Sequence, residues 1–304
     1  MTENRTITLL QEESGEENPS SIELTHYLDN VNAFFGFSEN PFNNTPDPSF
    51  FFMSRQHREA LLSMNFGIYQ RRGFIVVTGE VGCGKTTLCR RFFTQLSPEI
   101  KTAIILNSRI SGTHLLCSVV HDFGIPYKGK VKRGLYEALS SFLLEGIQHN
   151  QNACLIIDEA QALNLKVLEE IRLVSNFETS KQKLIQIVLM GQPELRETLE
   201  RPSLRQLRQR IGVYVHLKGL DLPETRDYVL HRLNVVSQGA STINFDFDVI
   251  KQIHGMTRGI PRLINTACDR VLMAAYKEQT KEITMAVAGQ AFEEIAFVCT
   301  DTQG

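Results

Sequence analysis

The stretch GEVGCGKTT at residues 79–87 constrains the fold of this chain more than any other part of the sequence. Gly79 and Gly84 stand five positions apart, and Lys85 and Thr86 follow the second glycine directly. Glycines in this pattern let backbone N–H groups turn inward around phosphate oxygens, and a following helix points its positive end at the same place. The run GFIVVTG just before it is typical of a buried parallel strand. The stretch therefore predicts a strand, a phosphate-binding loop and a helix, in that order.

This loop predicts a nucleotide site in which each residue type has its own task. We expect the Lys85 ammonium to reach the β- and γ-phosphates, and the Thr86 hydroxyl to be a ligand of Mg²⁺. The residues that we expect to bind the nucleotide are Gly79, Glu80, Val81, Gly82, Cys83, Gly84, Lys85, Thr86 and Thr87. The alternative is a glycine-rich turn that carries a lysine by chance, and the flanking strand and helix patterns argue against it.

The segment CLIIDEAQ at residues 154–161 supplies the acidic side chains that hydrolysis needs. Its apolar run predicts a buried strand that delivers Asp158 and Glu159 to the carboxyl end of a sheet, where α/β folds bind their ligands. Asp158 is placed to hold Mg²⁺ through water, and Glu159 is placed to orient and deprotonate the attacking water. Acids also end many buried strands without any such task. The phosphate loop upstream favours the catalytic interpretation.

Strand and helix patterns alternate along most of the chain. We expect strands at 74–77, 102–108, 153–161, 184–195 and 213–217, and from Leu222 onward only helices, at 223–236, 246–254, 260–277 and 283–296. This order predicts an α/β fold with a five-stranded parallel sheet, followed by a smaller all-helical domain. The predicted division is an acidic flexible tail at 1–27, an α/β core at 28–220, a helical lid at 221–297 and a flexible C-terminal tail at 298–304.

Polar residues at three later places extend the candidate site. Gln192 ends the fourth strand, where its amide can hydrogen-bond the γ-phosphate or the water; a simple turn into a helix is the alternative. Arg205, Arg208 and Arg210 precede the fifth strand, from which an arginine can reach the nucleotide of a neighbouring subunit, although a solvated basic face is the alternative. Arg262 in RGIPRLIN opens a helix of the last domain and can close over a bound nucleotide.

Composition argues against several other classes of protein. The chain has 304 residues and a net charge of −2, so no overall charge favours nucleic acid or an anionic membrane. Its six cysteines lack the spacing of a zinc site or a disulfide framework. Its apolar runs are shorter than a membrane span, and the N-terminus has no signal-peptide core. We expect a cytoplasmic protein without a membrane span.

The motifs together resemble the AAA+ superfamily, and within it the ExeA-like branch, the general secretion pathway protein A family. The stretches FGFSENPFNNTPDPSFFFMS, RGFIVVTGEVGCGKTTL, LRQLRQRI and TRGIPRLINTACDR carry the resemblance, which extends from about residue 34 to residue 296. It implies ATP and Mg²⁺ as cofactors and ATP hydrolysis as the activity. It also implies Glu159 as catalytic base, Gln192 and Arg262 as sensors, and Arg210 as the arginine finger. By the same resemblance, NPFNNTPD lies beside the adenine.

Two classes of function stay open at this point. The first is an ATPase that forms a homo-oligomer with ATP and assembles or remodels a protein complex of the secretion, pilus or export type. The second is a DNA-associated AAA+ regulator of the transposition or replication-initiator type. The loop YKGKVKRG at 127–134 favours the second, because Lys128, Lys130, Lys132 and Arg133 could line a DNA track in an oligomer. The net charge of −2 and the absence of an appended DNA-reading domain argue against it.

Overall fold

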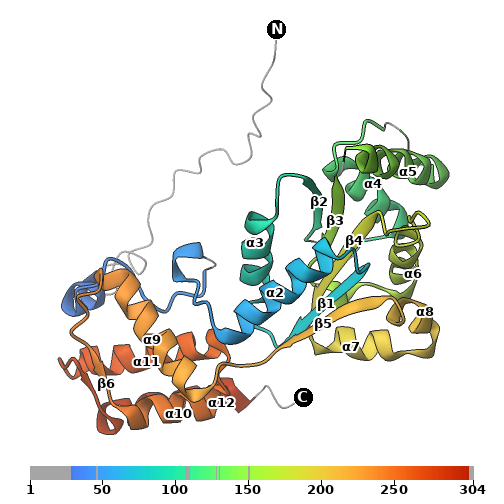
Figure 1. Ribbon diagram of the computed structural model, residues 1–304. Coiled ribbons are helices and arrows are strands. Elements are labelled where there is room, and N and C mark those ends of the chain that lie inside the picture. The colour runs from blue at the N-terminus through green and yellow to red at the C-terminus, as the bar shows by residue number, and fades with distance from the viewer. Residues whose placement is uncertain are drawn as a thin grey trace, which may run out of the picture.

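Figure 1 shows two parts of the molecule side by side, a sheet covered by helices and a group of helices next to it. The structure is a computed structural model that describes residues 29–45, 47–106, 110–127, 129, 131–149 and 151–300, with side chains as far as residue 296. The predicted tail at 1–27 lies outside the described residues. The predicted tail at 298–304 begins within the last helix, which extends to Thr300.

The predicted five-stranded parallel sheet is confirmed. Its strands are β1 (Phe74–Gly79), β2 (Ile100–Ile105), β3 (Asn152–Ile157), β4 (Ile185–Gly191) and β5 (Ile211–Leu217), in the spatial order β2-β3-β4-β1-β5. Every neighbouring pair is parallel. Strand β1 therefore lies between β4 and β5, and its carboxyl end at Gly79 opens directly into the phosphate loop. The strand predictions ran past the observed ends at Ile105, Ile157 and Gly191.

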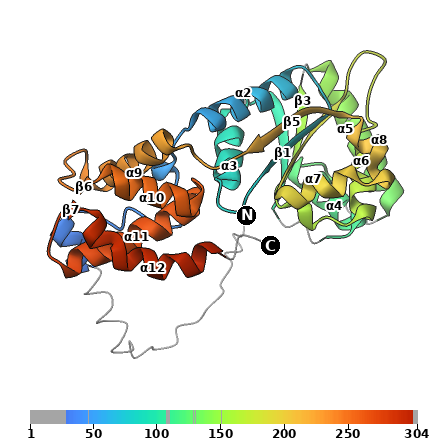
Figure 2. The same ribbon diagram turned by 90° about the horizontal axis from the view of Figure 1, so that it is seen from below.

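Helices cover both faces of the sheet (Figures 1 and 2). The helices of this part are α2 (Arg55–Tyr69), α3 (Lys85–Gln95), α4 (Gly112–Asp122), α5 (Lys132–Gln148), α6 (Leu165–Val174), α7 (Pro193–Glu200) and α8 (Arg205–Arg208). Alternate residues of β1 point to opposite faces, as the period of two demands. Phe74 and Val76 join the core with α4 to α7, whereas Ile75 and Val77 join the core with α2 and α3. Both cores are apolar, so the sheet is buried on each side.

The second part consists of α9 (Leu222–Ser237), α10 (Phe247–Thr257), α11 (Pro261–Lys277) and α12 (Met285–Thr300). Asp221 and Glu224 form a reciprocal capping box that starts α9, which stabilises the first turn. The prediction of helices alone was wrong here, because β6 (Asn244–Phe245) and β7 (Glu282–Ile283) form a small parallel pair. Strands of two residues are too short to leave an alternating pattern in the sequence.

The segment before α2 packs against this helical part. Residues 29–35 are helical, and the short 3-10 helix η1 (Pro48–Phe50) follows. Val31, Phe35, Phe37, Phe42 and Phe50 are buried in one apolar cluster with α9, α10, α11 and α12. Figure 1 shows this segment in blue against the orange and red helices. The division of the chain at residue 220 stays a prediction, and the packing groups residues 31–50 with the helices that follow that division.

The predicted basic loop at 127–134 needs a correction. Lys132 and Arg133 lie in the first turn of α5, which begins at Lys132. Lys128 and Lys130 lie outside the described residues. Within the part of the chain that the structure describes, no helix is both long and apolar enough to cross a membrane.

Candidate functional site

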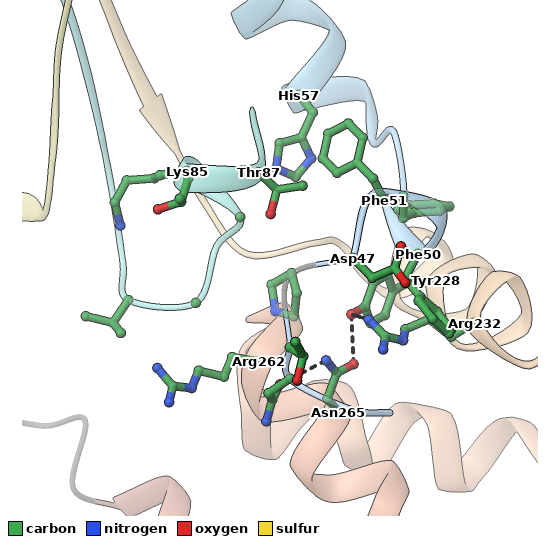
Figure 3. A pocket seen from close by; sticks show the side chains of 18 of the residues that line it. Asp47, Phe50, Phe51, His57, Lys85, Thr87, Tyr228, Arg232, Arg262 and Asn265 are labelled. Carbon is green, nitrogen blue, oxygen red and sulfur yellow. Dashed lines mark hydrogen bonds between the residues drawn. The ribbon is translucent and has the colours of Figure 1, made fainter. Parts of the chain in front are cut away.

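A cavity of about 350 Å³ lies where the phosphate loop, the segment before α2 and the helical part meet. Its walls come from the segment before α2, the phosphate loop with the start of α3, the ends of β3 and β4, and the helices α9 and α11. The lining residues of the first two are Asn43, Asn44, Thr45, Asp47, Phe50, Phe51, Phe52, Val81, Gly82, Gly84, Lys85, Thr86 and Thr87, and Glu159 and Gln192 follow the two strands. This volume is within the range of small-molecule and cofactor sites. Figure 3 shows Phe50, Phe51 and Tyr228 at one end of the cavity, with Lys85 and Arg262 at the other. We call these the base end and the phosphate end.

The phosphate loop has the backbone that its glycines allow. Gly82 and Gly84 have φ angles of 86° and 85°, in the left-handed region that glycine adopts without a steric penalty. Lys85 is buried, and its Nζ donates hydrogen bonds to the carbonyl oxygens of Gly79 at 2.7 Å and Glu80 at 2.9 Å. Burial lowers the pKa of Lys85, and the nearby carboxylates of Asp158 and Glu159 oppose this shift. The loop therefore holds one cation at its centre.

The start of α3 and the end of β3 meet through Thr86 and Asp158. Thr86 Oγ1 donates a hydrogen bond to Asp158 Oδ2 at 3.0 Å, and the backbone N–H of Glu159 donates to Asp158 Oδ1 at 2.9 Å. A hydroxyl and a carboxylate are the hard oxygen donors that suit Mg²⁺, which commonly takes only one or two protein ligands beside phosphate and water. In keeping with this, the described residues contain no cluster of three or more His, Cys, Asp or Glu side chains that could hold a metal alone. The residues thus fit Mg²⁺.

Glu159 and Gln192 lie together at the ends of β3 and β4, and a third residue joins them. Gln192 Nε2 lies 3.4 Å from Glu159 Oε2, and Gln161 Nε2 donates to the same oxygen at 2.5 Å. Gln161 stands in the motif CLIIDEAQ, but the sequence assigned it no role. Gln161 lies beyond the end of β3, so the alternation of side chains along that strand does not say which way Gln161 points. The fold shows it, because Gln161 accepts a hydrogen bond from the residue that follows β4.

Sequence reasoning also missed a buried histidine behind the phosphate loop. His57 Nδ1 lies 2.8 Å from Ser54 Oγ, and His57 Nε2 lies 3.1 Å from the carbonyl oxygen of Cys83. The carbonyl can only accept, so Nε2 carries the proton and Nδ1 accepts from the serine hydroxyl. Burial lowers the pKa of His57 and raises the pKa of the Cys83 thiol to about 11. Both side chains are thus neutral supports of the loop.

The base end is held by Arg232, Tyr228 and Asn265, none of which the sequence singled out. The Arg232 guanidinium is buried, donates to the carbonyl oxygens of Pro41 and Asn43, and lies with its Cζ 4.4 Å from the centre of the Phe50 ring. Figure 3 shows the hydrogen bonds of Tyr228 and Asn265 beside it. Tyr228 donates to Asn265 Oδ1 at 2.7 Å, and Asn265 Nδ2 donates to Asn44 Oδ1 at 3.0 Å. This network ties α9 and α11 to the predicted adenine-binding stretch NPFNNTPD.

Arg262 lines the phosphate end from the helical part. Its backbone N–H lies 3.4 Å from the carbonyl oxygen of Gly82. A Cβ atom added to Gly82 would lie 2.5 Å from the Cβ of Arg262, so the loop and the start of α11 approach this closely only because residue 82 is glycine. The predicted second sensor therefore stands beside the phosphate loop.

The three arginines before β5 lie away from this cavity. Phe74 pairs with Ile211 and Gly79 with Leu217, so Arg210 stands at the opposite end of β1 from the phosphate loop, roughly 16 Å along the strand. Arg210 Nη1 donates to Ser175 Oγ at 3.1 Å and also to Asn176 Oδ1. Arg208 donates to the carbonyl oxygen of Glu200 at 3.1 Å, and Arg205 is exposed. None of the three lines the cavity of its own chain.

The described cations of the predicted DNA track have acidic partners. Lys132 forms an ion pair with the buried Glu170, and Arg133 pairs with Glu137 at 2.8 Å. Tyr136 also donates to Glu170, at 2.5 Å, so this carboxylate joins α5 to α6. Lys132 thus has a structural partner, whereas the pair of Arg133 with Glu137 lies exposed on the surface.

Comparison with known proteins supports the same interpretation of the core. A family model described as an AAA domain matches residues 68–199, which include the phosphate loop and Glu159. General secretion pathway protein A of Aeromonas hydrophila is 39% identical over 264 residues, which are 86% of this chain and 48% of that protein. The chain thus spans about half the length of this relative.

Solved structures share the fold. Aeropyrum pernix ORC2, in a structure of its ADPNP and ADP complexes, is similar with a TM-score of 0.58 and 16% identity over 85% of this chain and 72% of that chain. A chain from the structure of Drosophila ORC bound to DNA has a TM-score of 0.63 and 16% identity over 95% of this chain and 70% of its own. At such identities these two show the fold alone. By the two sequence matches, residues 68–199 form an AAA domain and the chain is a relative of general secretion pathway protein A.

Proposed function

We propose that the chain binds ATP with Mg²⁺ and hydrolyses it to ADP and phosphate. The observation that carries this proposal is the hydrogen bond of 3.0 Å between Thr86 Oγ1 and Asp158 Oδ2. It joins the first turn after the phosphate loop to the strand end that also bears Glu159. A protein that only stored a nucleotide would need the loop but not an acidic pair at this edge.

The residues divide the work of hydrolysis among them. Lys85 neutralises charge on the phosphates. Thr86 and Asp158 would hold Mg²⁺, Asp158 through water, and the ion would polarise the phosphoryl oxygens. Glu159 accepts the proton of the attacking water. The Gln192 amide donates toward the γ-phosphate or that water. Arg262 contributes a second cation from α11, beside the loop.

We also propose that the active site is completed by a neighbouring copy of the chain. Arg210 faces away from its own cavity, at the amino end of β5, so it can assist hydrolysis only across an interface. A finger of this kind contributes several orders of magnitude in rate. ATP-dependent homo-oligomers follow from this arrangement. Arg205 and Arg208 are the alternatives if Arg210 keeps its bonds to α6.

The identity to general secretion pathway protein A supports a role in assembling or remodelling a protein complex of the secretion, pilus or export type. We place this activity in the cytoplasm, where ATP is supplied. A DNA-associated function is the second candidate. It rests on Lys128, Lys130 and Arg133, because Lys132 already pairs with the buried Glu170 whereas the pair of Arg133 is exposed. Retention of duplex DNA by the protein with a non-hydrolysable ATP analogue, and its loss in the Lys128→Ala, Lys130→Ala double variant, would favour it.

Glu159→Gln tests the proposed hydrolysis. The variant should bind a fluorescent ATP analogue as the natural protein does, while steady-state turnover falls by at least ~100-fold, the scale of a lost general base. Glu197→Gln is the matched control, because Glu197 is exposed on α7 and outside the cavity. Equal turnover in Glu159→Gln and the control would reject hydrolysis at this site.

The same variant tests the shared site. Arg210→Ala and Glu159→Gln proteins should each hydrolyse ATP poorly, for different reasons. In a mixture, some interfaces combine an intact Glu159 with an intact Arg210, so turnover should exceed the sum of the two separate proteins. No recovery in an oligomer shown to contain both chains would exclude Arg210 as the finger.

A further inference from the structure

The side-chain amide of Gln161 lies between the end of β3 and the end of β4. Its Nε2 donates to Glu159 Oε2 at 2.5 Å, and its Oε1 accepts from the backbone N–H of Gln192 at 3.0 Å. The amide thus contacts the proposed catalytic base on one side and the proposed sensor on the other. Gln161 is partly buried and does not itself line the cavity.

The direction of this amide is fixed by its partners. A backbone N–H can only donate, so the atom that faces Gln192 must be the oxygen of Gln161. The nitrogen is then left to face Glu159, whose carboxylate can only accept. If the amide were reversed, its NH2 group would face the backbone N–H of Gln192, and its oxygen would face the carboxylate of Glu159. The bridge therefore has a single satisfied orientation.

Gly191 makes room for this bridge. A Cβ atom added at Gly191 would lie 2.8 Å from Gln161 Oε1, closer than real Cβ contacts. Its φ angle is not in the left-handed region, so glycine is not needed there for the backbone conformation. The absence of a side chain at the end of β4 instead gives the Gln161 oxygen access to the N–H of the next residue.

Glu159 needs such support because its backbone is unusual. Its φ angle is 52°, in the left-handed region that non-glycine residues seldom adopt. Gln161 and Gln192 both donate to Oε2, whereas among the described residues no hydrogen bond reaches Oε1. One carboxylate oxygen is thus held in place, and the other remains free to accept a proton from water.

We propose that Gln161 is a positioning residue that fixes the Glu159 carboxylate and couples it to the end of β4. This inference rests on the proposed function of Glu159 as general base. A movement of Gln192 toward a bound γ-phosphate carries the backbone N–H that holds Gln161, and so changes the orientation of the base. Gln161 itself touches no substrate.

Two near-isosteric variants test the bridge. Gln161→Met keeps the volume but removes both hydrogen bonds, and Gln161→Glu keeps an acceptor for the Gln192 N–H but places a second carboxylate against Glu159. Each should lower kcat by roughly 10-fold, the effect of one hydrogen bond to a charged group. The Kd of a fluorescent ATP analogue should change by less than about two-fold, because no contact of the phosphate loop is altered. Gln148→Ala, on the exposed side of α5, is the control.

A double-mutant cycle separates positioning from a general structural role. If Gln161 acts through Glu159, then Gln161→Met should cause no further loss in a Glu159→Gln background, measured as single-turnover rates. Equal losses in both backgrounds would overturn the proposal, as would an unchanged or increased kcat in both single variants. If Gln161→Met does not fold, the same double-mutant cycle is measured with Gln161→Glu in its place. If instead the proposed function is wrong and Glu159 is not the general base, the single variant Glu159→Gln would leave turnover intact.

Discussion

The two ends of the cavity are built in different ways. At the phosphate end, Lys85 donates to carbonyls only 6 and 5 positions away in the chain. At the base end, the bond from Arg232 to Pro41 spans 191 positions, and the bond from Asn265 to Asn44 spans 221. The phosphate loop itself is a local structure at the carboxyl end of β1, to which α11 adds Arg262, whereas the base end exists only where distant segments meet.

This difference predicts different sensitivities. The phosphate loop keeps its shape as long as β1 and α3 are folded, because its contacts are short in sequence and rest on buried strands. The base end depends on how the helical part sits against residues 41–45, since α9 and α11 supply Arg232 and Asn265. The two ends can therefore be tested separately, with one ligand that contacts both ends and one that contacts a single end. ATP requires both ends, and inorganic triphosphate requires only the phosphate end.

The largest expected effect is at the phosphate end. Lys85→Ala removes the buried ammonium at the centre of the loop, so the affinities for ATP and for inorganic triphosphate should both fall by ~100-fold or more, from the loss of a buried charge pair. Isothermal titration with each ligand measures this. Lys166→Ala, at an exposed position of α6, should bind both ligands normally. Unaltered triphosphate binding in Lys85→Ala would show that the loop is not a phosphate site.

A smaller and more selective effect is expected at the base end. Arg232→Met leaves the carbonyl oxygens of Pro41 and Asn43 without their donor, which costs roughly 1–3 kcal/mol and loosens the loop beside the base. The affinity for ATP should fall by about 10-fold, while the affinity for inorganic triphosphate stays within about two-fold. Arg270→Met, at an exposed position of α11, is the control. Equal losses for both ligands would contradict the separation of the two ends.

The same contrast explains what the sequence could predict. The sheet, the phosphate loop and the pair Asp158 and Glu159 were predictable, because a run of apolar residues or a glycine spacing is a local signal. Arg232 falls inside the predicted helix 223–236, but only the packing of residues 31–50 against α9 makes it a buried support of the site. In the same way, Lys132 looked like a free cation until the fold brought Glu170 to it.

Gln161 shows the limit within a motif that was correctly identified. The segment CLIIDEAQ predicted a strand at 153–161 with Asp158 and Glu159 toward its carboxyl end, and in the structure that strand ends at Ile157. One of the two partners of Gln161 is the backbone N–H of Gln192, which follows β4, and no pattern along one segment specifies that neighbour. The sequence can thus name the residues that touch a phosphate more readily than those that hold these residues in place.

The smallest expected effect concerns His57, which supports the phosphate loop from behind. Burial lowers the pKa of His57 in the folded protein, whereas in the unfolded chain the pKa is about 6.5. Below that pH the unfolded chain gains a proton that the folded protein does not accept, so the free energy of unfolding falls on acidification. The loss continues until the pH reaches the lowered pKa of the folded state. The contribution of His57 to the free energy of unfolding is therefore lost as the pH falls.

His57→Gln tests this pH dependence. The glutamine amide can still donate to the Cys83 carbonyl but cannot take up a proton, so the variant should lose less stability than the natural protein between pH 7.5 and pH 5.5. Urea unfolding at a series of pH values measures the difference, with His114→Gln as an exposed control. If the natural protein and His57→Gln lose equal stability on acidification, then His57 is not held neutral beneath the loop. If the variant also binds triphosphate as the natural protein does, the histidine stabilises the loop without shaping the phosphate site.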